Sequence, residues 1–290
     1  GLYPKILGEQ KRRLFLSRIK DSSQTLRANR ALSKTRQRIE KSAGKLASGK
    51  RITSASDDAA GLSIATNMQS ELRTKRQATR NANDSISFMQ VMEGGIRSIN
   101  NLIIRVRELA VQSASDTVSN QERGYLHREA NGLIKEISRI SEVNQVNSQP
   151  LMRGEDKSLD IQVGDDNNSS SKLSFNLKEM AHTAYALGIY DISLDTQHHA
   201  NISMYKLDNA LRETSKSLAK IGTFQSQIKH AINGLETTTL NVDEARSRIE
   251  DADIAQTASE NITQKIKLQN QMAAHSTSQA RIATYLKLLD

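Results

Sequence analysis

The shortage of proline is the feature that most limits what this chain can fold into. Among 290 residues, proline occurs only at positions 4 and 150, so a stretch of over a hundred residues holds no obligatory helix breaker. Proline breaks helices because its ring removes a backbone donor and clashes with the preceding turn. Aromatic residues make up only 3% of the chain, which is atypical of β-sandwiches and barrels. We predict a mainly all-α protein built from long helices.

Two heptad patterns, far apart in the sequence, predict that these helices pack as a bundle. The first occupies residues 82–110, and the second begins near residue 207 and continues to about 249. Apolar residues recur in both at alternating spacings of four and three. The first helix carries a second apolar stripe, so it should contact more than one neighbour. The predicted bundle core contains Phe88, Ile99, Leu102, Val106, Leu218, Ile221, Ile228 and Leu235.

Shorter signals divide the rest of the chain. Residues 53–58 form an N-cap cluster ahead of the first long helix, and we interpret Asp57 and Asp58 as capping residues rather than a metal site. A second helix should run from 118 to about 143. Polarity alternates on either side of a polar loop, which predicts one small β-hairpin at about 158–178. Residues 181–204 show little periodicity and are assigned only as a connector.

The two ends of the chain are compatible with helices but polar. Residues 17–48 and 255–289 carry apolar stripes too thin for either end to order alone. We expect these helices to order against each other or against a neighbouring subunit. The predicted pairing residues are Leu26, Leu32, Ile39, Leu46, Ile266, Leu286 and Leu289.

The net charge of +9 is concentrated near the N-terminus, where residues 1–51 hold 15 Lys and Arg against 3 Asp and Glu. Clustered cations can bind nucleic acid or an anionic membrane. Only Tyr3 and Phe15 are available there for stacking, and the cations occur on every helical face. We therefore expect no nucleic-acid partner and no membrane insertion, with a basic helical nucleic-acid-binding protein as an alternative.

The sequence offers little chemistry for catalysis. The absence of Cys excludes disulfides, thiolate metal sites and cysteine nucleophiles. Phosphate-binding and zinc-protease motifs are missing, and we interpret the adjacent His198 and His199 as a solvated pair rather than a metal site. No apolar run is long enough to span a bilayer, and no cleavable export signal is visible. We expect no enzyme activity, no cofactor and no metal.

Several motifs, in order over nearly the whole chain, resemble those of bacterial flagellin. They are LASGKRI at 46–52, DDAAGL at 57–62, RNAND at 80–84, RVRELAVQS at 105–113, IQVG at 161–164 and EARSRIEDAD at 244–253. The resemblance implies an elongated coiled-coil and helical-bundle protein. It assigns 1–17 to an N-terminal extension, 18–50 and 251–290 to the two helices of an inner coiled-coil domain, and 51–250 to an outer helical bundle with the hairpin.

The chain also departs from the flagellin pattern in four places, of which the first is the extension before about Arg18, which that pattern lacks. Its N-terminal helix is unusually basic, and the stretch at 270–281 replaces the Gln-, Ala- and Asn-rich segment expected there. The surface domains that many flagellins insert after the hairpin are absent. The packing of the inner domain is therefore expected to differ in detail from that of other flagellins.

The resemblance implies a structural subunit that self-assembles head-to-tail into the bacterial flagellar filament, for motility, and that is secreted and extracellular. It implies as partners a flagellar export chaperone, the type III export apparatus, and hook-associated and cap proteins. Arg105, Leu109 and Glu129 match positions that contact a vertebrate innate immune receptor or neighbouring subunits, whereas Ile104 stands where the best recognised members carry Gln. A hook-filament junction protein of the same architecture is the alternative.

Overall fold

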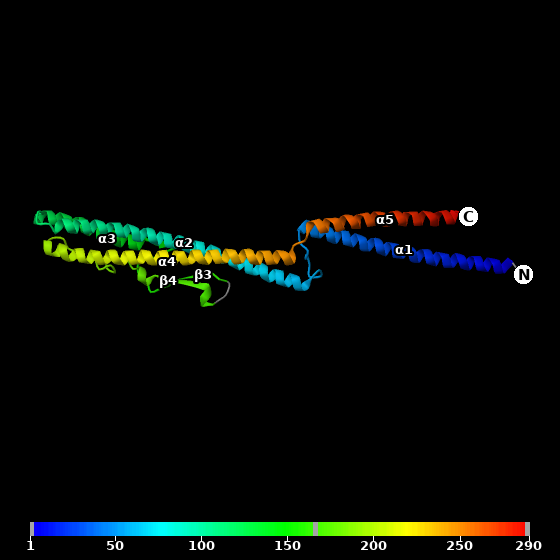
Figure 1. Ribbon diagram of the computed structural model, residues 1–290, viewed down its shortest axis with the longest axis horizontal. Helices are drawn as coiled ribbons and strands as arrows, with labels where there is room; N and C mark the ends of the chain where they lie inside the picture. The colour runs from blue at the N-terminus through cyan, green and yellow to red at the C-terminus, as the bar shows by residue number, and fades with distance from the viewer. Residues whose placement is uncertain (1–2, 165–167, 288–290) are drawn as a thin grey trace. The chain divides into compact units, whose positions relative to one another are not determined.

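The computed structural model describes the backbone of residues 3–164 and 168–287, and the side chains of 23–164, 168 and 170–280. Over these residues the fold is mainly helical, which confirms the predicted fold class (Figure 1). The long helices are α1 (Tyr3–Ser48), α2 (Ala59–Ser113), α3 (Asn120–Val143), α4 (Gln197–Glu250) and α5 (Ile254–Lys287). None of the helices over the described residues is long and apolar enough to cross a membrane.

The chain forms two compact units. One, here called the terminal unit, combines Gly1–Gln69 with Glu244–Asp290. The other, the central unit, is Ser70–Asp243. The boundaries between the two units fall inside the long helices α2 and α4. Helix α1 continues without a break past residue 17, the position at which the sequence predicted the end of an N-terminal extension.

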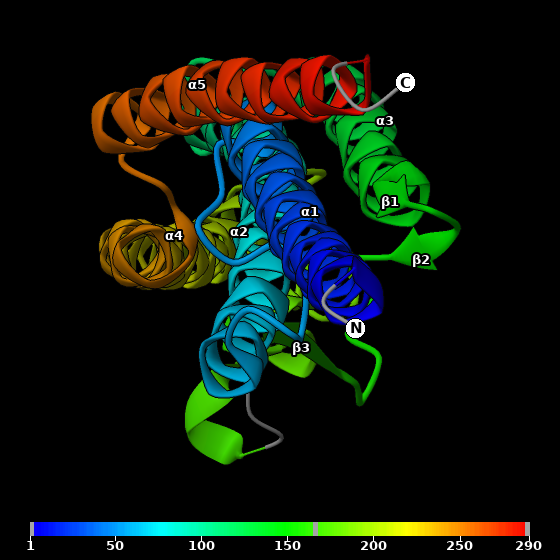
Figure 2. The same cartoon turned by 90° about the vertical axis from the view of Figure 1, so that its right-hand side faces the viewer.

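In the central unit, α2 contacts both α3 and α4, and the three helices are seen nearly end-on in Figure 2. Hydrogen bonds show that α2 and α4 run antiparallel: Arg107 pairs with Asp208 at 2.7 Å, and Thr214 donates to Asn100 at 2.8 Å. Nearer the other end of the contact, Gln225 donates to Glu93 at 3.0 Å. The two heptad patterns therefore meet in space, as their spacing predicted.

The core of the central unit forms where these helices face one another. Four of the predicted core residues, Ile99, Val106, Ile221 and Ile228, are completely buried. Phe88, Leu102 and Leu218 are partly buried and pack against the same cluster. Leu235 is buried nearer the end of the unit.

The hairpin pairs β3 (Ser158–Gln162) with β4 (Lys172–Asn176) in antiparallel register. Leu159 lies opposite Phe175, whose ring packs 4.8 Å from that of Phe224 in α4. A second pair, β1 (Gln145–Val146) and β2 (Gln149–Pro150), was not predicted. Strands of two residues are too short to show a period, and the turn between them uses two residues with positive φ, a conformation seen in tight hairpins.

The start of α2 agrees with the predicted cap cluster, and α3 begins with a cap that was not predicted. Asp58 accepts a hydrogen bond from the backbone of Gly61 at 2.9 Å, at the start of α2. Ser119 and Glu122 form a reciprocal capping box at the start of α3. Such caps satisfy backbone donors that have no partner within the helix. They explain why a short loop can separate α2 from α3.

Side-chain and backbone hydrogen bonds fix the connector before α4. Ser113 donates to the Leu194 carbonyl at 2.6 Å, and the Leu194 amide donates to His127 at 3.2 Å. The His182 amide donates to the Met152 carbonyl at 3.0 Å. Contacts of this kind leave no periodic signal in a sequence, which is why this segment could be named only a connector.

Candidate assembly surfaces

The terminal unit is built around the pairing of α1 with α5 (Figure 1). The residues buried deepest between these helices are polar: Thr35, Ser42, Thr257 and Asn261 are all under 10% exposed. The apolar stripes contribute less than the sequence suggested. Leu32, Ile39 and Leu46 are half-buried.

Two predicted pairing residues lie outside this seam. Leu26 is 55% exposed and Ile266 is 52% exposed, so the pairing of α1 with α5 does not bury them, and their burial against a neighbouring subunit stays a prediction. Polar residues are buried deepest on the inner face of the pair, and several apolar side chains, such as Leu26 and Ile266, are left exposed. The side chain of Leu286 and the whole of Leu289 lie outside the described residues.

Two loops close the terminal unit next to the helix pair. Lys50 and Asp251 form an isolated antiparallel bridge. The Arg51 amide donates to the Glu250 carbonyl at 2.7 Å, and the Ala252 amide donates to the Gly49 carbonyl at 2.9 Å. The Lys50 ammonium also pairs with the largely buried Glu250 carboxylate. These bonds join segments about two hundred residues apart in sequence.

The loop between α1 and α2 is tied back to α1 by an ion pair. Lys41 lies 2.5 Å from the Asp57 carboxylate, which also accepts hydrogen bonds from the backbone and hydroxyl of Thr53. The bond from Lys41, followed by those from Thr53, holds the pKa of Asp57 well below its usual range. The interpretation of Asp57 and Asp58 as capping and turn residues is confirmed by these contacts.

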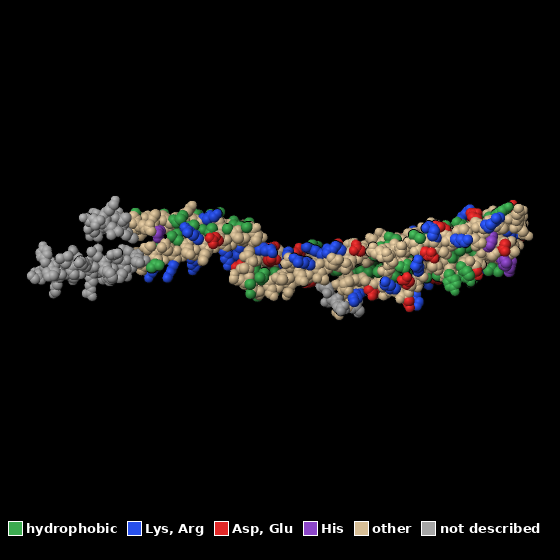
Figure 3. Space-filling view, turned by 180° about the vertical axis from the view of Figure 1, so that it is seen from behind, with side chains coloured by type: hydrophobic (Ala, Val, Ile, Leu, Met, Phe, Trp, Pro, Cys, Tyr) green, Lys and Arg blue, Asp and Glu red, His purple; other side chains and the backbone are tan. Residues whose placement is uncertain are grey.

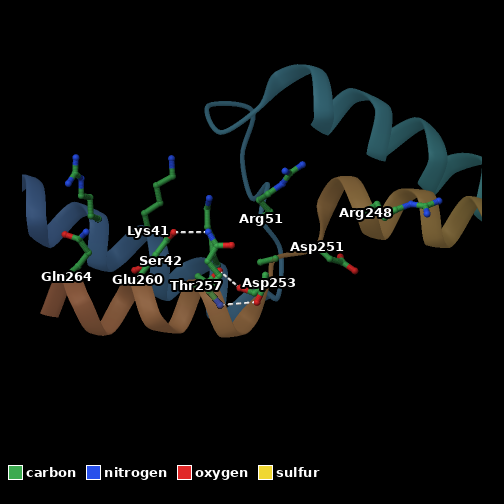
Figure 4. A pocket seen from close by; sticks show the side chains of 13 residues that line it. Lys41, Ser42, Arg51, Arg248, Asp251, Asp253, Thr257, Glu260 and Gln264 are labelled. Carbon is green, nitrogen blue, oxygen red and sulfur yellow. Dashed lines mark hydrogen bonds between the residues drawn. The ribbon is translucent and has the colours of Figure 1, made fainter. Parts of the chain in front are cut away.

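A polar pocket of about 660 Å³ lies beside this loop, between α1 and α5 (Figure 4). Figure 4 shows Lys41 and Ser42 projecting from α1 and Thr257, Glu260 and Gln264 from α5. The pocket holds basic and acidic side chains together, since Arg51 and Arg248 lie opposite Asp251 and Asp253. No group of three or more potential metal ligands occurs among the described residues.

The cations of α1 form an ordered row in the part of the helix whose side chains are described. Seven Lys and Arg residues lie between residues 23 and 48. Six of them follow one another at spacings of three or four residues and so share one side of the helix, whereas Arg36 does not fit this spacing. Glu40 is the single acid of that stretch. Lys and Arg side chains project from this helix in Figure 3. The six are Arg27, Arg30, Lys34, Arg38, Lys41 and Lys45.

A second surface lies on the central unit where α2 meets α3. Arg105 bridges the helices, lying 3.0 Å from Glu129 and 3.1 Å from Glu108. All three side chains are about half exposed, and the bonds to Glu108 and Glu129 raise the pKa of Arg105. Leu109 is only 2% exposed and belongs to the core, so it is not available to a partner as the sequence suggested. Ile104 beside it is 41% exposed.

The polar residues that make the terminal unit specific were not predicted from the apolar stripes. They are Asn261, Ser42 and the Lys50–Glu250 pair. A usable signal existed for Asn261. It lies seven residues after Ile254 and seven before Leu268, at the position where the heptad expects an apolar residue.

These features define a class of protein: a mainly helical chain whose first and last helices pair and keep uncovered apolar side chains. The chain belongs to the bacterial flagellin family. The family model of the bacterial flagellin N-terminal helical region matches residues 19–157, and that of the C-terminal helical region matches 204–289.

Relatives of the chain cover most of its length. It is 34% identical over 216 residues to the flagellin of Halalkalibacterium halodurans, a match that covers 74% of this chain and 79% of the relative. It is 31% identical to the flagellar filament 33 kDa core protein of Treponema phagedenis, over 90% of this chain and 96% of the relative. The second match therefore runs nearly end to end, and the first covers about three quarters of the chain.

A solved structure shares the fold. It is a Vibrio parahaemolyticus protein described as a flagellar hook-associated protein, with a TM-score of 0.55. The match covers 67% of this chain and 100% of that one. At 14% identity it shows a common fold and nothing about function.

Proposed function

We propose that this chain is a structural subunit that self-assembles into a bacterial flagellar filament. The observation that carries the proposal is the apolar surface left on the paired terminal helices. Leu26, Ile254, Ile262, Ile266 and Met272 remain between 42% and 58% exposed after α1 and α5 have paired. Contact with neighbouring subunits would remove this surface from water.

The physics of such an assembly follows from the type of contact. When one face of a subunit binds a different face of the next and the rotation does not close, the product is a helical filament. Ile262 and Ile266 lie four residues apart and share one side of α5. A neighbour that covers both would gain roughly 1.5–3 kcal/mol for each side chain fully buried.

The test is assembly of the full chain, followed by electron microscopy and by measurement of the critical concentration. Replacing Ile262 and Ile266 together by Gln keeps the charge and the helix but removes the apolar surface. We expect the critical concentration to rise at least about tenfold. The matched control replaces the exposed Ser259 and Thr263 by Gln at the same spacing.

The control variant should assemble like the wild type, and all proteins should have the same helix content by circular dichroism. A wild-type chain that forms no filaments under any condition would refute the proposed function. Equal critical concentrations for the two Gln variants would show that the α5 face is not an assembly surface.

The relatives' names support a filament protein over the two alternatives, a junction protein and a nucleic-acid binder, because they describe flagellins and filament core proteins. We extend the proposal to the export route. A filament subunit outside the cell needs an export apparatus and a chaperone, and it meets hook-associated and cap proteins at the filament ends. In this role the chain is a building block without catalysis or a cofactor.

We further propose Arg105 and Glu129 as contact residues, either for neighbouring subunits or for a vertebrate innate immune receptor. The support is their exposure on the surface between α2 and α3. Replacing both by Ala should reduce the response of receptor-bearing cells to dissociated subunits. Replacing the exposed pair Glu136 and Arg139 on α3 is the control, because it also removes one ion pair. An unchanged response would remove the receptor assignment.

A further inference from the structure

Over residues 26–48 of α1 and 254–279 of α5, Asn261 makes the directional contact across the seam. Asn261 is 5% exposed, and its amide donates to the Ser42 hydroxyl at 2.7 Å and to the Ile39 carbonyl at 3.2 Å. Across residues 26–48 of α1 and 254–279 of α5, no other hydrogen bond or ion pair joins the helices. Within these ranges Asn261 is the residue whose side chain bonds across the seam, while the backbone bonds of Arg51 with Glu250 and of Ala252 with Gly49 hold the adjoining loops together.

The hydroxyl groups of the other buried polar residues of the seam, Thr35 and Thr257, do not donate to the partner helix. Thr35 donates to the Ala31 carbonyl at 2.9 Å, within α1. Thr257 donates to the Asp253 carbonyl at 2.7 Å, on its own side of the seam. These bonds would survive if one helix slid along the other. They satisfy the hydroxyl groups without fixing the register.

Apolar packing also leaves the register open. A shift of α5 by one heptad would place Leu268 or Ile254 where Asn261 now faces Ser42. Both residues are apolar, so burial alone would favour the shifted alignments. In helix pairs, a buried Asn at an otherwise apolar position is known to select one register at some cost in stability.

We propose that Asn261 is the specificity-determining residue of the terminal unit, and that its bonds to Ile39 and Ser42 select the register in which α1 and α5 pair. The inference rests on the proposed function for its consequence. A slip of one heptad moves α5 by roughly 10 Å along α1. Such a slip would move the exposed Ile262 and Ile266 by the same distance relative to α1 and so change the surface offered to the next subunit.

Disulfide trapping in the full chain tests this, because the chain has no Cys of its own. Ala31 and Gln271 line one cavity of about 240 Å³ between the helices, so cysteines at these positions report the native register. Cysteines replacing Ala31 and Gln264 report a shift of one heptad. The intrachain disulfide is separated from any interchain product by mobility on a non-reducing gel.

The change under test is Asn261→Val. We expect the ratio of native to shifted disulfide to fall roughly tenfold, as the loss of two hydrogen bonds allows. Helix content should stay the same and the thermal midpoint should change little, since Val loses two hydrogen bonds but buries apolar surface in their place. A loss of register without a loss of stability is the result that a merely structural role would not give.

Two further variants complete the experiment. Asn270→Val makes the same change at an exposed position of α5 and should keep the native ratio. Asn261→Gln keeps an amide donor and should restore part of the selectivity. A native ratio in Asn261→Val, or an unfolded helix pair in that variant, would overturn the inference. Since the disulfide forms within one chain, failure to polymerise would count against the proposed function only.

Discussion

His182 is buried in the central unit, at 1% exposure, with its Nδ1 donating to the Met180 carbonyl at 2.8 Å. Burial lowers the pKa of His182 from its ordinary value of 6.5, because the charged imidazolium would lose its hydration. The bond to Met180 and the charge of Glu213 oppose this effect without reversing it. The unfolded chain therefore takes up a proton more readily than the folded one. The stabilisation from neutral His182 is complete above pH 6.5 and is lost as the pH falls below it.

We predict that His182→Asn will weaken the acid sensitivity of the fold. Asn keeps a donor near the position of Nδ1 but does not titrate. Between pH 7 and pH 5, the free energy of unfolding should fall less in this variant than in the wild type, as measured by urea denaturation at both pH values. His198→Asn removes an exposed histidine and should behave like the wild type. Equal pH dependence in all three proteins would contradict the prediction.

At the scale of elements, two adjacent glycines of α2 have opposite roles. A Cβ on Gly95 would lie 2.1 Å from the Asn144 amide nitrogen and 2.9 Å from the Met152 sulfur. Met152 is fully buried and cannot move aside freely. A Cβ on Gly94 would meet nothing within 4 Å. Gly95 therefore permits the close approach of α2 to the chain that follows α3, while Gly94 only weakens the helix.

We expect Gly95→Ala to destabilise the central unit by about 1–3 kcal/mol through overpacking. Gly94→Ala should stabilise it by about 0.5–1 kcal/mol, because Ala loses less backbone entropy in a helix. Urea unfolding of the two variants measures both effects. Stabilisation of similar size in both would mean that Asn144 and Met152 repack without cost.

At the scale of the whole molecule, the central unit has its own apolar core, whereas α1 and α5 pair through a polar seam. We predict that limited proteolysis will leave a fragment of roughly residues 50–250 that unfolds cooperatively but does not polymerise. Electron microscopy and calorimetry of the purified fragment check this. Normal filaments from the fragment would show that the terminal helices are not needed for assembly.

The charge of α1 gives a second prediction at this scale. Between residues 23 and 48, seven cations face a single acid, Glu40, and many copies of this helix would come together in a filament. Like charges repel by about 1 kcal/mol at 4 Å in water, and salt screens them over about 8–10 Å. Polymer yield should therefore rise as moderate salt is added. A steady fall in yield would show that attraction to acidic surfaces dominates.

The sequence by itself determined the helical architecture, the cap at Asp58, and the core positions Ile99, Val106, Ile221 and Ile228. These features depend on local chemistry and on period, which a sequence displays directly. The motifs also led to the family.

Only the tertiary structure decided which face of each terminal helix is covered. It placed Leu26 and Ile266 in solvent, Leu109 in the core and Asn261 in the seam. The stripes of α1 and α5 are too weak to define one inner face, so the alignment depends on a hydrogen bond between residues about two hundred positions apart. Such a bond follows from how the chain returns on itself, and no local pattern encodes it.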